Sequence, residues 1–230
     1  MKIVKGSIVG SLLVGGVLLA GCTATTGDAN KDAENVKTEK FTYEKFELPL
    51  EEKVFLGDKD AEHEIVLVFD YSCPWCKKWM DEVLPDIEEK YINTGDAIYK
   101  GQPLVLLNKN SQYMANVDYN VEKHAPEKYY EIQRKFGSDS GSIGWAKDSY
   151  VEKISKEFDI VGVKKLTDPE GMDIGIKNSR LYTRDLGVKY VPTVYVDGIK
   201  ISDSFSVEEI GEVIEGKIKE GDVTEVPVAE

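Results

Sequence analysis

The chain has 230 residues, with 29 basic against 42 acidic side chains and a formal net charge of −13. Such a surface repels phosphate polymers and anionic head groups, so binding to nucleic acid is disfavoured. The chain has only three cysteines, which excludes a small secreted scaffold held together by disulfides.

The first 21 residues have the pattern of a signal peptide. Lys2 and Lys5 precede an apolar stretch that is too short for a comfortable membrane span. Removal of these residues leaves 27 basic against 42 acidic side chains, a net charge of −15. The folded part is therefore expected to work outside the cytosol, where a disulfide can persist.

The signal peptide ends in the sequence LAGC at positions 19–22, which resembles the bacterial lipobox. This resemblance implies cleavage before Cys22, a diacylglycerol group on its thiol, and a lipoprotein of the Gram-positive type anchored to the extracytoplasmic face of the cell membrane. The alternative is a plain secretory leader in which Cys22 is incidental.

Composition divides the rest of the chain into a tether, one domain and a tail. Residues 22–40 are small, polar and charged without an apolar period, which predicts a flexible tether. Apolar and polar residues alternate at positions 41–48, as in a strand with one buried face. Residues 41–220 have the length of one domain, and residues 221–230 are expected to form a polar tail.

Two cysteines lie where an apolar strand runs into a helix. The run at positions 65–69 is rich in β-branched and aromatic residues and has the length of a buried strand. After Cys76, apolar residues recur at helical spacing from Trp79 to Ile87. Cys73 and Cys76 are therefore predicted to lie in the first turn of a helix.

This placement favours a reactive thiolate on Cys73. The first N–H groups of a helix have no partner within it and favour a negative charge beside them. Pro74 suits the first helical position because it has no N–H. We therefore expect a lowered pKa for Cys73, the nucleophile, and assign Cys76 as the resolving thiol.

Other uses of a cysteine pair fit this chain less well. A structural zinc site needs four ligands, and only Cys22, His63 and His124 remain to complete one. Covalent haem attachment requires His after the second cysteine, where Lys77 stands. A structural disulfide would close too small a loop to stabilise much. Redox chemistry without a metal or cofactor is the favoured interpretation.

The remaining pattern predicts one more strand, a helical block and a terminal hairpin. The apolar run at positions 103–107 is predicted to be a central strand. Between positions 108 and 186 apolar residues fall at helical intervals. Asp197-Gly198 between β-branched runs predicts a hairpin turn, and residues 207–218 predict a closing helix.

Two segments resemble known landmarks of the DsbA family, thioredoxin-fold proteins that oxidise thiols outside the cytoplasm. They are FDYSCPWC at positions 69–76 and LGVKYVPTVYVDG at positions 186–198. In that family the proline of the second segment is cis and faces the cysteines. The resemblance assigns this place to Pro192 and a flanking substrate contact to Val191.

The resemblance also implies the fold class, which is an α/β, thioredoxin-like fold with an inserted helical subdomain. Residues 41–107 and 187–220 would form the two halves of the thioredoxin-like domain, and residues 108–186 the helical insertion.

The implied activity is donation of the Cys73–Cys76 disulfide to exported proteins with free thiols, through a mixed disulfide. A membrane redox partner would then reset the two cysteines. Trp75, on an exposed first turn, is expected to offer substrates an apolar contact, or alternatively to pack against the insertion.

One departure from the family leaves a role open. Thioredoxins and the enteric DsbA carry a buried carboxylate six residues before the first cysteine, where this chain has Leu67. Asp70 stands three residues before Cys73 and is interpreted either as a cap-region residue or as a proton relay.

Three rival functions also remain. They are a lipid-anchored reductase or isomerase on the same fold, a dedicated helper in cytochrome or metal-centre maturation, and a redox-inactive binding lipoprotein of the cell surface.

Overall fold

The computed structural model describes residues 37–228. The predicted signal peptide, the lipidation of Cys22 and most of the predicted tether lie outside these residues. Within the described part of the chain, no helix combines the length and apolar character that a membrane crossing requires.

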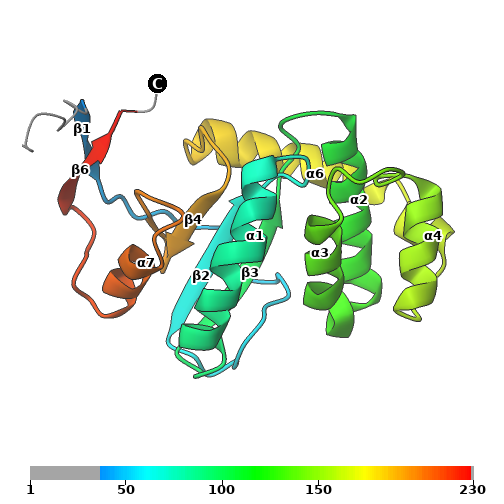
Figure 1. Ribbon diagram of the computed structural model, residues 1–230, viewed down its shortest axis with the longest axis horizontal. Coiled ribbons are helices and arrows are strands. Elements are labelled where there is room, and N and C mark those ends of the chain that lie inside the picture. The colour runs from blue at the N-terminus through cyan, green and yellow to red at the C-terminus, as the bar shows by residue number, and fades with distance from the viewer. Residues whose placement is uncertain (1–36, 229–230) are drawn as a thin grey trace, which may run out of the picture. The chain divides into compact units, whose positions relative to one another are not determined.

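A four-stranded sheet organises the fold (Figure 1). Its strands are β2 (His63–Phe69), β3 (Ala97–Pro103), β4 (Thr193–Val196) and β5 (Ile199–Lys200), in the spatial order β3-β2-β4-β5. β3 runs parallel to β2, whereas β4 runs antiparallel to both β2 and β5. β2 has a neighbour on each side and both faces of the sheet are covered, so the apolar run at positions 65–69 is fully buried, as predicted.

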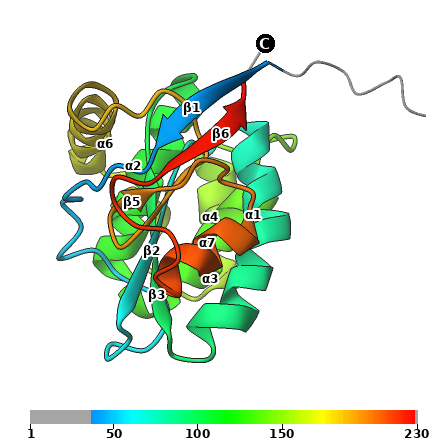
Figure 2. The ribbon, with the colours of Figure 1, turned by 90° about the vertical axis from the view of Figure 1, so that its left-hand side faces the viewer.

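Successive residues of β2 point to opposite faces of the sheet and divide the core into two clusters. Ile65, Leu67 and Phe69 pack in one cluster with residues of α1 (Pro74–Ile87) and α7 (Val207–Ile214). The even-numbered residues pack in the other with Tyr182 and Val188. Figure 2 shows α1 and α7 on one side of the sheet and α6 (Glu170–Arg180) on the other.

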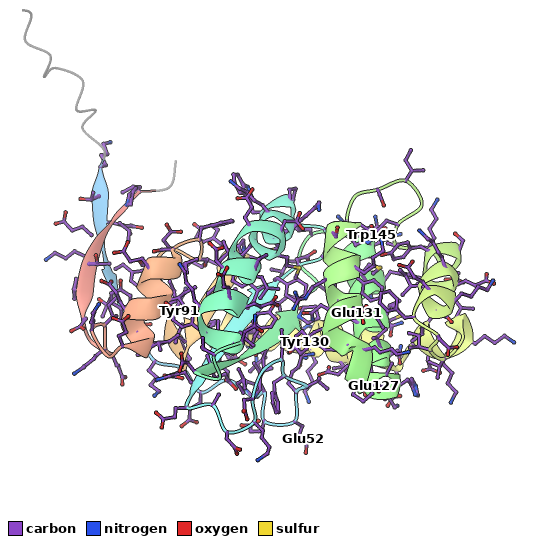
Figure 3. All side chains as sticks on the ribbon, turned by 60° about the horizontal axis from the view of Figure 1, so that its bottom comes forward. Glu52, Tyr91, Glu127, Tyr130, Glu131 and Trp145 are labelled. Atoms are coloured by element: carbon purple, nitrogen blue, oxygen red, sulfur yellow. The ribbon has the colours of Figure 1, made fainter. Side chains whose placement is uncertain are left out.

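The chain between β3 and β4 is helical, as the spacing of its apolar residues predicts. In chain order it contains α2 (Lys109–His124), a 3-10 turn (Pro126–Lys128), α3 (Tyr129–Ser138), α4 (Asp148–Glu157), α5 (Val163–Leu166), α6 and a π-helical turn (Leu181–Asp185). Tyr130, labelled in Figure 3, joins this helical block to the sheet. Its ring centroid lies 5.5 Å from that of Tyr99 in β3, and its hydroxyl accepts the N–H of Gly101 at 3.4 Å.

The predicted strand at positions 103–107 is wrong. β3 shares only Pro103 with that run and lies at the edge of the sheet. Its polar Lys100 is buried because the ammonium pairs with Glu64 at 2.6 Å and donates to the carbonyl of Leu50 at 2.8 Å. Pro103 ends the strand, since it cannot donate to a ladder.

The ends of the described chain are more regular than predicted. β1 (Thr38–Thr42) pairs antiparallel with β6 (Val223–Pro227) in a separate two-stranded sheet. Part of the predicted tether and part of the predicted polar tail are therefore strands. The alternating run at positions 41–48 is a strand only to Thr42, although Lys45 forms an isolated bridge with Ile199.

The hairpin turn at Asp197-Gly198 is confirmed. It joins β4 to β5, and both residues have positive φ, 50° at Asp197 and 80° at Gly198, as a type I′ turn requires. The closing helix α7 is shorter than predicted and ends at Ile214.

Candidate active site

A four-residue turn leads from β2 to the two cysteines. The turn closes where the N–H of Cys73 donates to the carbonyl of Asp70 at 3.0 Å. Cys73 is the N-cap of α1, with extended φ and ψ of −84° and 118°, and Pro74 begins the helix. The predicted placement in the first helical turn is confirmed.

The two thiols have opposite acidities. The pKa of Cys73 is lowered to about 6, first by a hydrogen bond from the Cys76 thiol, against desolvation, and then by the backbone N–H groups of Cys76 and Trp75. Burial raises the pKa of Cys76 well above its ordinary value, and its hydrogen bond to Cys73 adds to this shift. The arrangement favours a thiolate on Cys73 beside a protonated Cys76.

Access to the sulfurs is narrower than the sequence suggests. Only 6% of Cys73 and 1% of Cys76 is exposed. Trp75, between them, is 61% exposed, as expected for the first turn. Its ring contacts Phe205 edge-on, with centroids 6.3 Å apart, and the ammonium of Lys78 lies 5.5 Å from the Trp75 ring. Phe205 follows β5, so the aromatic partner of Trp75 lies outside the helical insertion.

The segment before β4 closes over Cys73. The peptide bond between Val191 and Pro192 is cis, as the family resemblance implies. The thiol of Cys73 lies 3.5 Å from the carbonyl oxygen of Val191, to which it donates when protonated. Two segments that are 118 residues apart in sequence thus meet at the reactive sulfur.

Ser204 holds this proline segment and was missed in the sequence. Its hydroxyl donates to the carbonyl of Pro192 at 3.0 Å, while its own carbonyl accepts the indole N–H of Trp79 at 2.7 Å. Ser204 therefore ties the segment to α1, the helix that begins at the cysteines. No local pattern marks this serine.

Asp70 binds two loops together. It is fully buried, and its carboxylate accepts the N–H groups of Ser72 at 2.7 Å, Leu106 at 2.8 Å and Leu107 at 3.1 Å. These three bonds fix the turn before Cys73 against the chain after β3. These contacts favour the cap-region interpretation of Asp70 over the proton relay. Leu67 is fully buried within β2, opposite Gly101 and Val194.

The part of the chain that the structure describes contains no cluster of side chains suited to bind a metal ion. Among residues 37–228, no three His, Cys, Asp or Glu side chains cluster as an ion would require. His63 lies instead at the start of β2, where its Nδ1 is 2.7 Å from the carboxylate of Asp197.

Comparison with known proteins agrees with this geometry. The family model described as thioredoxin matches residues 50–216. Disulfide bond formation protein D of Bacillus subtilis is 23% identical over 169 residues, which cover 71% of this chain and 76% of the relative. A probable disulfide bond formation protein D of Bacillus cereus is 29% identical over 153 residues, covering 62% and 69%.

Solved structures share the fold. Oxidised BdbD from Bacillus subtilis superposes with a TM-score of 0.69 at 20% identity and covers 77% of this chain and 98% of its own. Wolbachia pipientis alpha-DsbA1 has a TM-score of 0.61 at 20% identity, covering 74% and 92%. The expected fold class is confirmed. The chain belongs to the thioredoxin family and has the thioredoxin-like α/β fold with a helical insertion.

Proposed function

We propose that this thiol-disulfide oxidoreductase is a dithiol oxidase that donates the Cys73–Cys76 disulfide to exported proteins. The observation that carries the proposal is the contrast between Cys73, whose pKa is lowered to about 6, and Cys76, whose pKa is raised. A thiolate that is stabilised in the reduced enzyme makes the disulfide a stronger oxidant.

The reaction begins with the oxidised enzyme. A substrate thiolate attacks the sulfur of Cys73, the Cys73–Cys76 bond breaks, and Cys76 leaves with the electron pair and takes up a proton. A second substrate thiolate then attacks the substrate sulfur of the mixed disulfide. Cys73 leaves as a thiolate, which its low pKa favours. The substrate has lost two electrons, and the enzyme cysteines have gained them.

Trp75 and the segment at Val191 and Pro192 are proposed to hold the substrate. Trp75 offers an exposed apolar surface directly between the cysteines. In the disulfide and in the mixed disulfide Cys73 has no hydrogen to donate, so the carbonyl of Val191 is free to accept a backbone N–H of the substrate. Pairing of this kind adds an extended chain as a strand.

The proposed place of work is the extracytoplasmic face of the cell membrane. The lipobox-like sequence before Cys22 supports a lipid anchor there. The relatives named for disulfide bond formation support an oxidising role. A membrane redox partner is proposed to take the two electrons from Cys73 and Cys76 and restore the disulfide.

The test uses the purified chain with Cys22→Ser, so that Cys73 and Cys76 are its only thiols. A reduction potential of about −120 mV supports the oxidase, whereas a potential of about −270 mV supports a thioredoxin-like reductase. Inactivity in both insulin reduction and dithiol oxidation would leave only a redox-inactive binding protein.

A further inference from the structure

We propose that the helical insertion positions Cys73 through Tyr71, and that Asp118 of α2 is the positioning residue that holds Tyr71. Tyr71 stands inside the turn that Asp70 and Cys73 close. This inference rests on the proposed redox role of the cysteine pair and adds to it the part of the chain that sets the geometry of the reactive thiol.

The turn before Cys73 is held from the insertion at three points. The hydroxyl of Tyr71 donates to the Asp118 carboxylate at 2.5 Å. The carbonyl of Tyr71 accepts the hydroxyl of Ser140, which follows α3, at 2.5 Å. The hydroxyl of Ser72 donates to the side chain of Asn108, the N-cap of α2, at 3.0 Å. All three partners belong to residues 108–186.

Asp118 is a carboxylate in the protein interior. It is 1% exposed, and desolvation raises its pKa, although the positive charge of Lys53 opposes the shift. A buried carboxylate is costly unless hydrogen bonds compensate it. Besides Tyr71, the hydroxyl of Tyr129 donates to Asp118 at 2.9 Å, and the amide of Gln133 lies at 3.4 Å.

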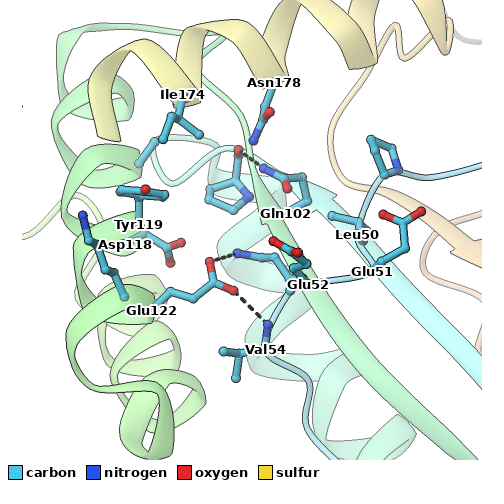
Figure 4. Close-up of a pocket in the computed structure, with 16 residues that line it drawn as sticks. Leu50, Glu51, Glu52, Val54, Gln102, Asp118, Tyr119, Glu122, Ile174 and Asn178 are labelled. Atoms are coloured by element: carbon cyan, nitrogen blue, oxygen red, sulfur yellow. Dashed lines mark hydrogen bonds and ion pairs between the residues drawn. The ribbon is translucent and has the colours of Figure 1, made fainter. Parts of the chain in front are cut away.

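An ion pair near this carboxylate holds the hydroxyl of Tyr129. Lys53 pairs with Glu122 at 2.6 Å, and its ammonium also donates to the hydroxyl of Tyr129 at 3.0 Å. Figure 4 shows Asp118 and Glu122 beside each other in the wall of a cavity of about 680 Å³. The bonds from Tyr71 to Asp118 to Tyr129 to Lys53 thus run from the active-site turn to this cavity.

The position of the turn matters because the stability of the Cys73 thiolate depends on the alignment of its hydrogen-bond donors. The backbone N–H groups of Trp75 and Cys76 lower the pKa of Cys73, and hydrogen bonds weaken steeply when donor and acceptor are misaligned. Tyr71 is two residues before Cys73, so a turn released from Asp118 would let the sulfur drift from these donors. The thiolate would then be less stable and the disulfide a weaker oxidant.

The test compares Tyr71→Phe with the matched control Tyr129→Phe, both with Cys22→Ser. Each substitution removes one hydroxyl from Asp118, but only the first lies in the active-site turn. The thiolate absorbance of Cys73 is titrated, and the equilibrium constant with glutathione is measured. Tyr71→Phe is expected to lower the thiolate-to-thiol ratio about threefold, which is about half a pKa unit, and to shift the glutathione equilibrium equally toward the enzyme disulfide. Tyr129→Phe is expected to change both values much less, because the bond between Tyr71 and Asp118 remains.

A third variant, Ser140→Ala, keeps the test decisive if Tyr71→Phe fails to fold, because it releases the carbonyl of the same residue. It is expected to shift both readouts in the same direction. Unchanged values in Tyr71→Phe and Ser140→Ala, or equal shifts in Tyr71→Phe and Tyr129→Phe, would overturn the role of Tyr71 and Asp118. A pKa of about 8.5 for Cys73 in the wild-type protein would instead overturn the proposed oxidase function.

Discussion

The hydroxyl of Ser204 donates to the carbonyl of Pro192 at 3.0 Å, and through this bond the loop before α7 holds the segment that closes over Cys73. The same residue accepts the indole N–H of Trp79 from α1. The cysteines and the proline segment therefore share one support, and the distance between Cys73 and Val191 depends on a serine in neither motif.

Ser204→Ala is expected to slow oxidation of a dithiol peptide several-fold and to leave oxidation of a small dithiol nearly unchanged. In the proposed binding mode, the segment at Val191 contacts only a substrate long enough to reach it, and loss of the Ser204 bond costs about 1 kcal/mol. The rates for the two substrates are compared in one oxidation assay.

Ser206→Ala is the matched control for that comparison. The Ser206 hydroxyl accepts the N–H of Glu209 at 3.0 Å and caps α7, so its loss is expected to lower stability by about 1 kcal/mol without changing either rate. A peptide rate that falls equally in both variants would show that Ser204 acts only through stability.

The reduced form is expected to lose stability as pH falls from about 8.5 to 6. The pKa of Cys73 is near 6 when folded and about 8.5 when unfolded, so the folded state holds the thiolate more strongly. This contributes stability of about 3 kcal/mol that is present above pH 8.5 and lost as pH falls through 6. The oxidised form has no such thiol.

Denaturant unfolding of both forms at pH 8 and pH 5 checks this expectation. Cys76 stays protonated in the folded protein, because burial raises its pKa. In the unfolded chain it is mostly protonated below about pH 8.5, so the difference reports mainly on Cys73. The free energy of unfolding of the reduced form, relative to that of the oxidised form, is expected to be higher at pH 8 than at pH 5. An equal gap at the two pH values would contradict a stabilised thiolate.

Asp70→Asn is expected to lower stability while leaving turnover within a few-fold. One amide oxygen replaces two carboxylate oxygens that accept three N–H groups, and the new NH₂ group faces donors. A buried group left without its bond costs about 1–3 kcal/mol. Unfolding and the oxidation rate of a reduced substrate are measured together, and a hundred-fold loss of rate in folded protein would identify a proton relay instead.

Sequence patterns predicted correctly those features that depend on residues close together in the chain. The cysteines at the helix start and the turn at Asp197-Gly198 depend on neighbouring residues, and both are confirmed. The position of β3 was missed because Lys100 makes the strand look exposed, while its charge is satisfied by Glu64 from β2. Hydrophobic periodicity carries no information about such a partner.

The contacts that hold the active-site turn could not be predicted from the sequence for the same reason. Tyr71 and Asp118 are 47 residues apart, and Asp70 reaches Leu106 over 36 residues. Similarly, β1 pairs with β6 from the opposite end of the domain, although both segments are polar enough to suggest a tether and a tail. Contacts of this kind arise only when the topology brings the elements together.

Cys76→Ala, loaded at Cys73 with glutathione, is expected to form mixed disulfides with many reduced exported proteins. A substrate thiolate attacks Cys73 and releases glutathione, and no Cys76 remains to displace the substrate. Exchange is best followed near pH 8, where a substantial fraction of ordinary substrate thiols, with a pKa of about 8.5, is ionised. Cys73→Ala is the control and should trap nothing, since Cys76 is only 1% exposed. Acid quenching and non-reducing electrophoresis count the trapped partners, and only one or two would indicate a dedicated helper rather than a general oxidase.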